Sequence, residues 1–95
     1  MAVGDVKSGL FSVSGQGVLN IQPPSSEEWV IHNIYHESSI ELYFSSGAND
    51  LLFDSDAGNG VYAKYAFHVT NHNFIKVKNT CDSTYLIGYD GIQTK

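Results

Sequence analysis

Apolar and polar residues alternate with a period of two along several short stretches of this chain. Between Val61 and Val69 the odd positions are apolar or aromatic, while the even positions include Tyr62, Lys64 and His68. Side chains of a β-strand point alternately to its two faces, so this period is typical of a strand with one buried face. The same alternation occurs in three further stretches: 40–44, 73–78 and 85–89. The sequence therefore predicts antiparallel β-strands and no helix of useful length.

Clusters of glycine, proline, asparagine, aspartate and serine separate these stretches, and such residues favour tight turns. About eight short strands result, which predicts an all-β chain folded as a compact antiparallel β-sandwich or jelly roll. An immunoglobulin-like sandwich fits the same pattern, because it differs only in how the strands are connected. The turn clusters lie at 15–17, 23–27, 45–50, 56–60, 71–73 and 79–83.

The 95 residues are expected to form a single β domain. Its first segment, residues 1–9, departs from the pattern of a packed strand. We therefore expect residues 1–9 to be a mobile or docking arm that reaches a neighbouring protein.

Charge and cysteine content narrow the possible partners and compartments. Ten acidic and five basic residues give a net charge of −5, which argues against binding to nucleic acid or to an anionic membrane. No apolar run reaches the roughly 18 residues that a membrane helix needs, and the start of the chain lacks the features of a secretion signal. The single cysteine, Cys81, excludes an intrachain disulfide and fits a reducing compartment.

Two pairs of histidines have the spacing His-x-x-x-His, in WVIHNIYH and again at His68 and His72. On a helix this spacing would place both rings on one face. The first pair, His32 and His36, lies in a predicted strand, where the two would share a face but stand about 13 Å apart. Ligands of one zinc ion each lie about 2 Å from it, so we interpret these histidines as structural and expect no metal site.

The segment DSDAGNG, residues 54–60, begins like a calcium-binding loop. It lacks the third ligand, because glycine stands at that position, and it lacks the bidentate glutamate, which is replaced by a tyrosine within a predicted strand. An ordinary turn is the preferred interpretation. The candidate ligands for a cation are Asp54, Asp56 and Asn59, together with Asp50.

The sequence predicts no catalytic site and no cofactor. Cys81 lies in a polar turn without a histidine at a suggestive position. Glu27 and Glu28 are adjacent, so on a strand they point to opposite faces and form no acid–base pair. The GYDG segment that begins at Gly88 has no following helix to bind a phosphate. We therefore expect a protein that is not an enzyme.

Some residues are harder to place in a small core. Tyr43, Tyr62 and His68 fall on the second face of strands whose other face is already apolar, which suggests that part of the outer surface is covered by a partner. Tyrosines there would suit a protein interface or serve as platforms for sugar rings. The candidate partner-interface residues are Tyr43, Tyr62 and His68 on this surface, and Val3, Val6 and Lys7 in the expected arm.

Several segments together resemble a known group of proteins. They are GVLNIQPP, EEWVIHNIYH, IELYF with its following Gly/Asn/Asp turn, FHVTN, FIKVKN and the closing IGYDGIQTK. This combination resembles the small virion accessory proteins of tailed bacteriophages, which decorate or cement the capsid. The similarity covers about residues 17–95 and lies in strand style and size.

The resemblance implies a compact β-sandwich or jelly roll, usually a homotrimer, that sits where capsid subunits meet and ties them together. Its partner would be the major capsid protein, and its location the capsid surface of the virion, with assembly in the cytoplasm of the host bacterium. The resemblance carries no catalytic or cofactor residues to this sequence.

Two other functions fit the same residues. A carbohydrate-binding or host-adhesion module would be a monomer with exposed aromatic side chains. A tail or fibre component would be attached to a longer protein, which the absence of a coiled-coil extension makes less expected.

Overall fold

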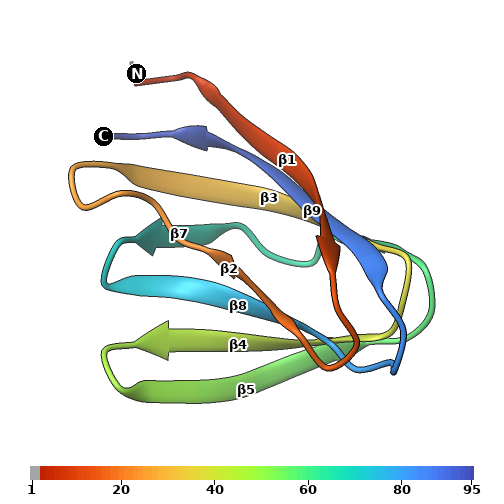
Figure 1. Ribbon diagram of the computed structural model, residues 1–95. Coiled ribbons are helices and arrows are strands. Elements are labelled where there is room, and N and C mark those ends of the chain that lie inside the picture. Colours follow the sequence, from red (N-terminus) through yellow and green to blue (C-terminus); the bar gives the residue numbers. More distant parts are fainter. Residues whose placement is uncertain (1–2) are drawn as a thin grey trace.

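The computed structural model describes residues 3–95 of the chain as two antiparallel β-sheets packed face to face (Figure 1). In sheet A the strand order is β1-β9-β3-β6, and β7 also pairs with β3; in sheet B the order is β2-β8-β4-β5. The expected all-β sandwich is thus confirmed. The strands of this described region are β1 (Val6–Val13), β2 (Val18–Ile21), β3 (Glu28–His36), β4 (Ile40–Ser46), β5 (Asn49–Asp56), β6 (Gly60–Tyr62), β7 (Phe67–Thr70), β8 (Asn73–Asn79) and β9 (Tyr85–Gln93).

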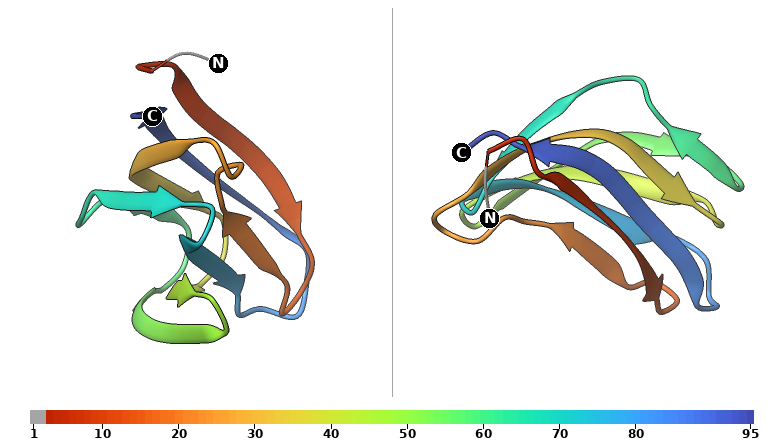
Figure 2. Two further views of the ribbon diagram at one scale, coloured as in Figure 1. Left: turned by 90° about the vertical axis from the view of Figure 1, so that its left-hand side faces the viewer. Right: turned by 90° about the horizontal axis from the view of Figure 1, so that it is seen from above.

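The strands pair in a nested order. The first strand pairs with the last, β2 with β8, β3 with both β6 and β7, and β4 with β5. This is the winding of a jelly roll, in which a long hairpin is rolled up so that its successive strand pairs form two sheets. The two curved layers are visible in Figure 2, and both ends of the chain lie at the same end of the sandwich (Figure 1). Residues 3–95 include no helix that is long and apolar enough to cross a membrane.

The core lies between the two sheets. It consists largely of branched aliphatic side chains, which the alternation along each strand points inward. Fully burying one such side chain contributes about 1.5–3 kcal/mol. Sheet A and sheet B supply core residues in similar numbers, so both sheets contribute to the buried apolar surface. The core residues with almost no exposed surface include Ile31, Ile34 and Ile87 from sheet A and Ile21, Leu42, Ile75 and Val77 from sheet B.

A β-bulge in β3 corrects one prediction. Ile31 pairs with Gly91 and Asn33 with Asp90, so His32 is an extra residue with no partner in β9. The extra residue reverses the alternation, and the buried positions change from odd to even numbers after it. His32 is therefore exposed while His36 is buried, and the prediction that they share a face is wrong.

The predicted strand over residues 61–69 is also corrected. Residues 63–66 interrupt it, leaving β6 and β7 as two short strands along the same edge of β3. The interruption changes which positions face inward, so Tyr62 is buried in the core and Val61 is exposed. Phe67 and Val69 face inward as predicted.

The expected arm over residues 1–9 is only partly compatible with the fold. Residues 6–9 are the first half of β1 and pair with β9 in regular register, so they are not an arm. Before them, Gly4 donates its backbone N–H to the Gln93 carbonyl, over 2.7 Å. Met1 and Ala2 lie outside the described residues.

Candidate functional site

The outer face of sheet A is the most unusual surface of the molecule. Residues directly opposite one another in antiparallel strands point to the same face, so the strand registers define three rows across this side of the sheet. We call these residues the A face. The first row is Val6, Ile92 and Val30; the second is Ser8, Asp90 and Asn33; the third is Leu10, Gly88, Tyr35 and Val61.

The outer two rows of the A face are apolar and open to solvent. Val6 is 72% exposed, Leu10 61%, Val61 51% and Ile92 40%. Single exposed apolar residues are normal, but a contiguous group of them marks an interaction surface. The A face therefore has the composition of a surface that a partner covers.

The middle row of the A face is polar and well ordered by hydrogen bonds. Tyr35 donates its hydroxyl to one oxygen of the Asp90 carboxylate over 2.5 Å, and Asn33 donates Nδ2 to the other oxygen over 2.9 Å. The hydrogen bond to Asp90, followed by partial burial, raises the pKa of the Tyr35 hydroxyl. These contacts hold the carboxylate in one place between the two apolar rows.

A shallow groove crosses the A face, lined by Val6, Ser8, Leu10, Tyr35 and Asp90. Gly88, which pairs with Leu10, has no side chain in the third row. A Cβ atom at Gly88 would lie 2.4 Å from the backbone oxygen of Gly9, so this position accepts no larger residue without a shift of the backbone. The groove thus runs directly up to the Asp90 carboxylate.

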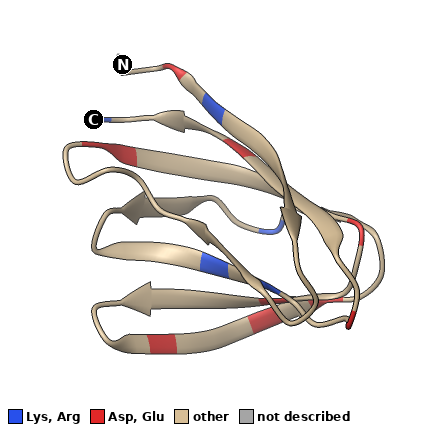
Figure 3. Cartoon of the chain, viewed as in Figure 1, with Lys and Arg blue, Asp and Glu red and all other residues tan. Residues whose placement is uncertain are grey.

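The outer face of sheet B carries charged side chains instead. Lys76 forms an ion pair with Asp50 over 3.1 Å, and Tyr43 donates its hydroxyl to Glu41 over 2.8 Å, which raises the pKa of Tyr43. Figure 3 shows charged positions on β8 and β5, the strands that carry Lys76 and Asp50. We call this surface the B face; a shallow groove on it is lined by Gln16, Val18, Asn20, Tyr43, Asp50, Lys76 and Lys78.

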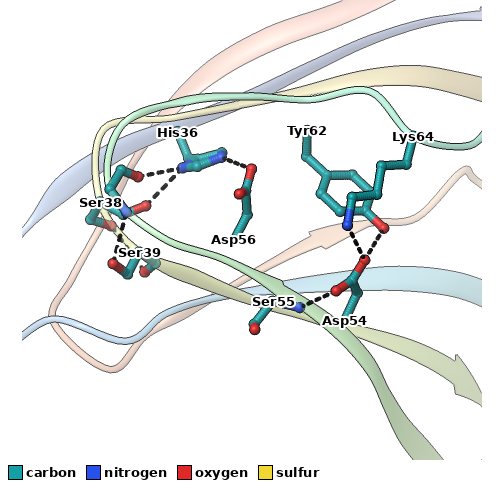
Figure 4. Close-up of polar contacts among 9 residues, drawn as sticks. His36, Ser38, Ser39, Asp54, Ser55, Asp56, Tyr62 and Lys64 are labelled. Atoms are coloured by element: carbon teal, nitrogen blue, oxygen red, sulfur yellow. Dashed lines mark hydrogen bonds and ion pairs between the residues drawn. The ribbon is translucent and has the colours of Figure 1, made fainter.

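A polar cluster at one end of the sandwich contains two of the candidate cation ligands, Asp54 and Asp56 (Figure 4). Asp54 accepts hydrogen bonds from the Tyr62 hydroxyl over 2.7 Å and from Lys64 over 3.3 Å. The first of these is the main cause that lowers the pKa of Asp54, with a further contribution from the backbone N–H of Ser55. Asp54 therefore connects sheet B to the core tyrosine of sheet A.

His36 holds the neighbouring turn in the same cluster. Its Nδ1 lies 2.8 Å from the carbonyl oxygens of both Ser38 and Gly58, and its Nε2 lies 3.0 Å from the Asp56 carboxylate. Both ring nitrogens thus lie within hydrogen-bond distance of oxygen atoms. The contacts fasten the turn that follows β5 onto the end of β3.

The two carboxylates of this cluster are bound to different partners, and Asn59 is exposed on the turn beyond them. The additional candidate, Asp50, lies on the B face, where it pairs with Lys76. Within residues 3–95, no three His, Cys, Asp or Glu side chains gather closely enough to hold a metal ion. The cluster acts chemically as a set of internal hydrogen bonds.

The predicted interface residues are dispersed over the molecule. Val6 lies on the A face. His68 of β7 lies opposite Val30 of β3, at the margin of the same face. Val3 is exposed just before β1. Tyr43 belongs to the B face on the other side of the sandwich.

Two of the predicted interface residues point inward. Tyr62 is part of the core. Lys7 is buried, with its ammonium group 3.4 Å from a Glu27 carboxylate oxygen and 5.5 Å from the centre of the Trp29 ring. Lys7 therefore closes one end of the sandwich and is not available to a partner.

Sequence reasoning missed most of the A face. Leu10, Tyr35, Asp90 and Ile92 were not among the candidates, although the alternation predicted over residues 85–89 implies that the even-numbered positions of the last strand share one side. That signal was present in the alternation of the last strand. No known protein family and no curated protein matches the sequence.

A second exposed apolar group lies at the end of the β4–β5 hairpin. Phe44 pairs with both Leu51 and Ile75, so it shares the inner face of sheet B with that buried isoleucine. Leu51 is nevertheless 63% exposed, and Phe44 is 38% exposed. The inner surface of sheet B is therefore uncovered at the hairpin.

Proposed function

We propose that this chain is a non-enzymatic structural protein that stabilises an assembled bacteriophage capsid as a decoration, or cement, protein. The observation that carries the proposal is the A face, whose exposed apolar rows are suited to being covered by another protein. The resemblance of the sequence to small phage virion proteins supplies the identity of that partner. The major capsid protein, arranged in the assembled shell, would bind the A face at the capsid surface of the virion.

Such a protein would act through binding alone. A module that binds the assembled shell and not the free subunits shifts the equilibrium toward the shell by mass action. The apolar rows supply the gain from removing water, and the rigid sheet beneath them loses little conformational freedom on docking. No group of the protein needs to react, and assembly would take place in the cytoplasm of the host bacterium.

We further propose that the protein is a homotrimer. The uncovered end of the β4–β5 hairpin supports this, because Phe44 and Leu51 expose apolar surface there that does not belong to the A face. Contacts between subunits at this end would leave the A face of each subunit free for the capsid. A substitution of Leu51→Lys is expected to convert the oligomer to a monomer, which light scattering would detect.

A carbohydrate-binding or host-adhesion module is the second candidate. It is favoured by one observation, the position of the Tyr35 ring beside the polar groups of Asp90 and Asn33. Sugars are commonly held by an aromatic ring and by carboxylate or amide groups that accept and donate hydrogen bonds. In this case the protein would be a monomer.

The test is to measure the mass of the purified protein by light scattering and then its co-sedimentation with empty phage capsids. A trimer that pellets with capsids is the expected result. A monomer that stays in the supernatant would overturn the proposal, and a glycan screen would then examine the second candidate. Sedimentation with isolated tails but not with capsids would instead indicate a tail component.

A further inference from the structure

Asp90 has a special position on the A face. Of the residues that make up this face, only Asp90 carries a charge. It lies in the middle row, between the apolar row that contains Val6 and the one that contains Leu10. A partner that covers both apolar rows therefore also covers this carboxylate.

The carboxylate remains able to bind a further group. Each of its oxygens accepts one hydrogen bond, from Tyr35 and from Asn33 respectively. An ionised carboxylate has about four acceptor sites, so roughly two are left unused. Because its neighbours already fix its direction, a ligand that binds the unused sites has little ordering cost to overcome.

We propose that the A face receives a basic side chain of its partner, an arginine or lysine, whose cationic group binds the Asp90 carboxylate. The inference rests on the proposed docking function of the A face and adds the chemistry of the partner. Covering a carboxylate without supplying a hydrogen-bond donor or a positive charge is strongly unfavourable. A partner that buries the apolar rows must therefore compensate Asp90.

The shape of the groove fits such a side chain. Val6 and Leu10 line it on either side of Asp90, so they would contact the aliphatic stem of an arginine or lysine while its charged end reaches the carboxylate. Arginine suits the site best, because its planar guanidinium group donates two parallel hydrogen bonds and packs against aromatic rings such as that of Tyr35. The net charge of −5 also attracts a basic surface from a distance.

The experiment uses the ¹⁵N-labelled full chain, titrated with N-acetyl-arginine amide and, as the matched neutral control, with N-acetyl-citrulline amide. We expect the arginine compound to shift the NMR signals of Tyr35, Asp90 and the side-chain amide of Asn33, and the citrulline compound to leave them in place. The substitution Asp90→Asn should abolish the shifts. The control substitution Asp50→Asn, on the B face, should preserve them.

Three results would overturn the inference. The first is an equal response to arginine and citrulline, and the second is a response centred on the B face. The third is a shift of the Tyr35 and Asn33 signals by a neutral methyl glycoside but not by arginine, which would identify sugar hydroxyls as the donors.

A measurement of capsid binding distinguishes a failure of this inference from a failure of the proposed function on which it rests. If the wild-type protein does not sediment with capsids, the proposed function fails whatever the NMR result. If it does, Asp90→Asn should weaken binding roughly tenfold or more, because the basic group loses its charged partner. Unchanged capsid binding by Asp90→Asn, together with no arginine-specific shift, would overturn the inference and leave the proposed function in place.

Discussion

The outer faces of the two sheets are built on the same kind of pleated backbone but carry opposite kinds of side chain. The B face carries charged lysine and aspartate side chains, including the Lys76–Asp50 ion pair. The A face has two exposed apolar rows around one hydrogen-bonded carboxylate. Both sheets supply core residues in similar numbers, so the core does not account for this difference. Under the proposed function, the two faces would have different surroundings, because only the A face would be covered by the capsid.

The largest effect is expected from substitutions in the core. They test whether the two sheets differ only on their outer faces. Ile34 of sheet A and Ile75 of sheet B are each 1% exposed. Truncating either to alanine should cost about 2–5 kcal/mol of unfolding free energy, since each change leaves a cavity in the same core. Chemical denaturation measures both values. If only one of the two variants were destabilised, the sheets would differ in their inner faces as well.

The next prediction compares how substitutions on the A face and on the B face change capsid binding. Leu10 on the A face and Leu52, which lies opposite Tyr43 on the B side, are 61% and 50% exposed. Leu10→Lys should weaken sedimentation with capsids by about a hundredfold or more, because the new charge would be buried in the contact.

Leu52→Lys is the matched control for that experiment and should bind like the wild type. Both exposed substitutions should leave the unfolding free energy within about 0.5 kcal/mol of the wild-type value. Equal loss of binding by the two variants would show that docking does not distinguish the faces.

A smaller effect should appear in acid, at the polar connection between the sheets. The Tyr62 hydroxyl holds the pKa of Asp54 below its ordinary value of 3.8. A carboxyl group whose pKa is lowered by folding adds stability at pH values above its unfolded pKa, and this stability is lost as the pH falls through the folded pKa. The thermal midpoint should therefore decrease below about pH 4.

Substitution of either partner tests the cause of this acid dependence. Both Asp54→Asn and Tyr62→Phe should be less stable than the wild type at neutral pH, and both should lose less stability between pH 5 and pH 3. Thermal unfolding followed by circular dichroism gives the comparison. An undiminished acid response in both variants would assign the effect to other carboxyl groups.

The smallest expected effect concerns salt. Lys76→Met removes an exposed ion pair, so any loss of stability at low salt should disappear at about 1 M salt, where charges are screened within roughly 3 Å. Tyr35→Phe removes a short hydrogen bond to Asp90, and its effect should persist at high salt. Thermal midpoints at both salt concentrations would show whether the A and B faces differ in this way.

Much of the fold was predictable because the period of two is a local property of the sequence. The alternation predicted over residues 40–44 and 73–78 places Ile40, Leu42, Ile75 and Val77 on the apolar sides of their strands, and all four are buried. The same reasoning failed at His32, because whether a strand accommodates an extra residue depends on its partner strand, which is distant in the sequence. The position of Tyr62 was wrong for a related reason, since the interruption at residues 63–66 has no strong turn signal.

The A face was harder to predict than the core. An apolar residue such as Leu10 is normally assigned to the interior, so its sequence position offers no reason to place it outside. Val6 was a candidate only as part of the expected arm. The role of Asp90 depends on three strands meeting in one register, which brings Asn33 and Tyr35 to it from a different part of the chain. Such a site becomes visible only when the strand order is known.

The nested strand order also limits when the protein can fold during its synthesis. Sheet A cannot be completed until β9 has been made, because β9 lies between β1 and β3. Until β9 has been made, β1 therefore has no partner strand and one side of β3 stays unpaired. Pairing between the two ends of a chain is also slow, on the order of milliseconds to seconds for β-proteins of this kind. Sheet A should consequently form only after β9 has left the ribosome, and chains that still lack β9 would be the form most prone to aggregation.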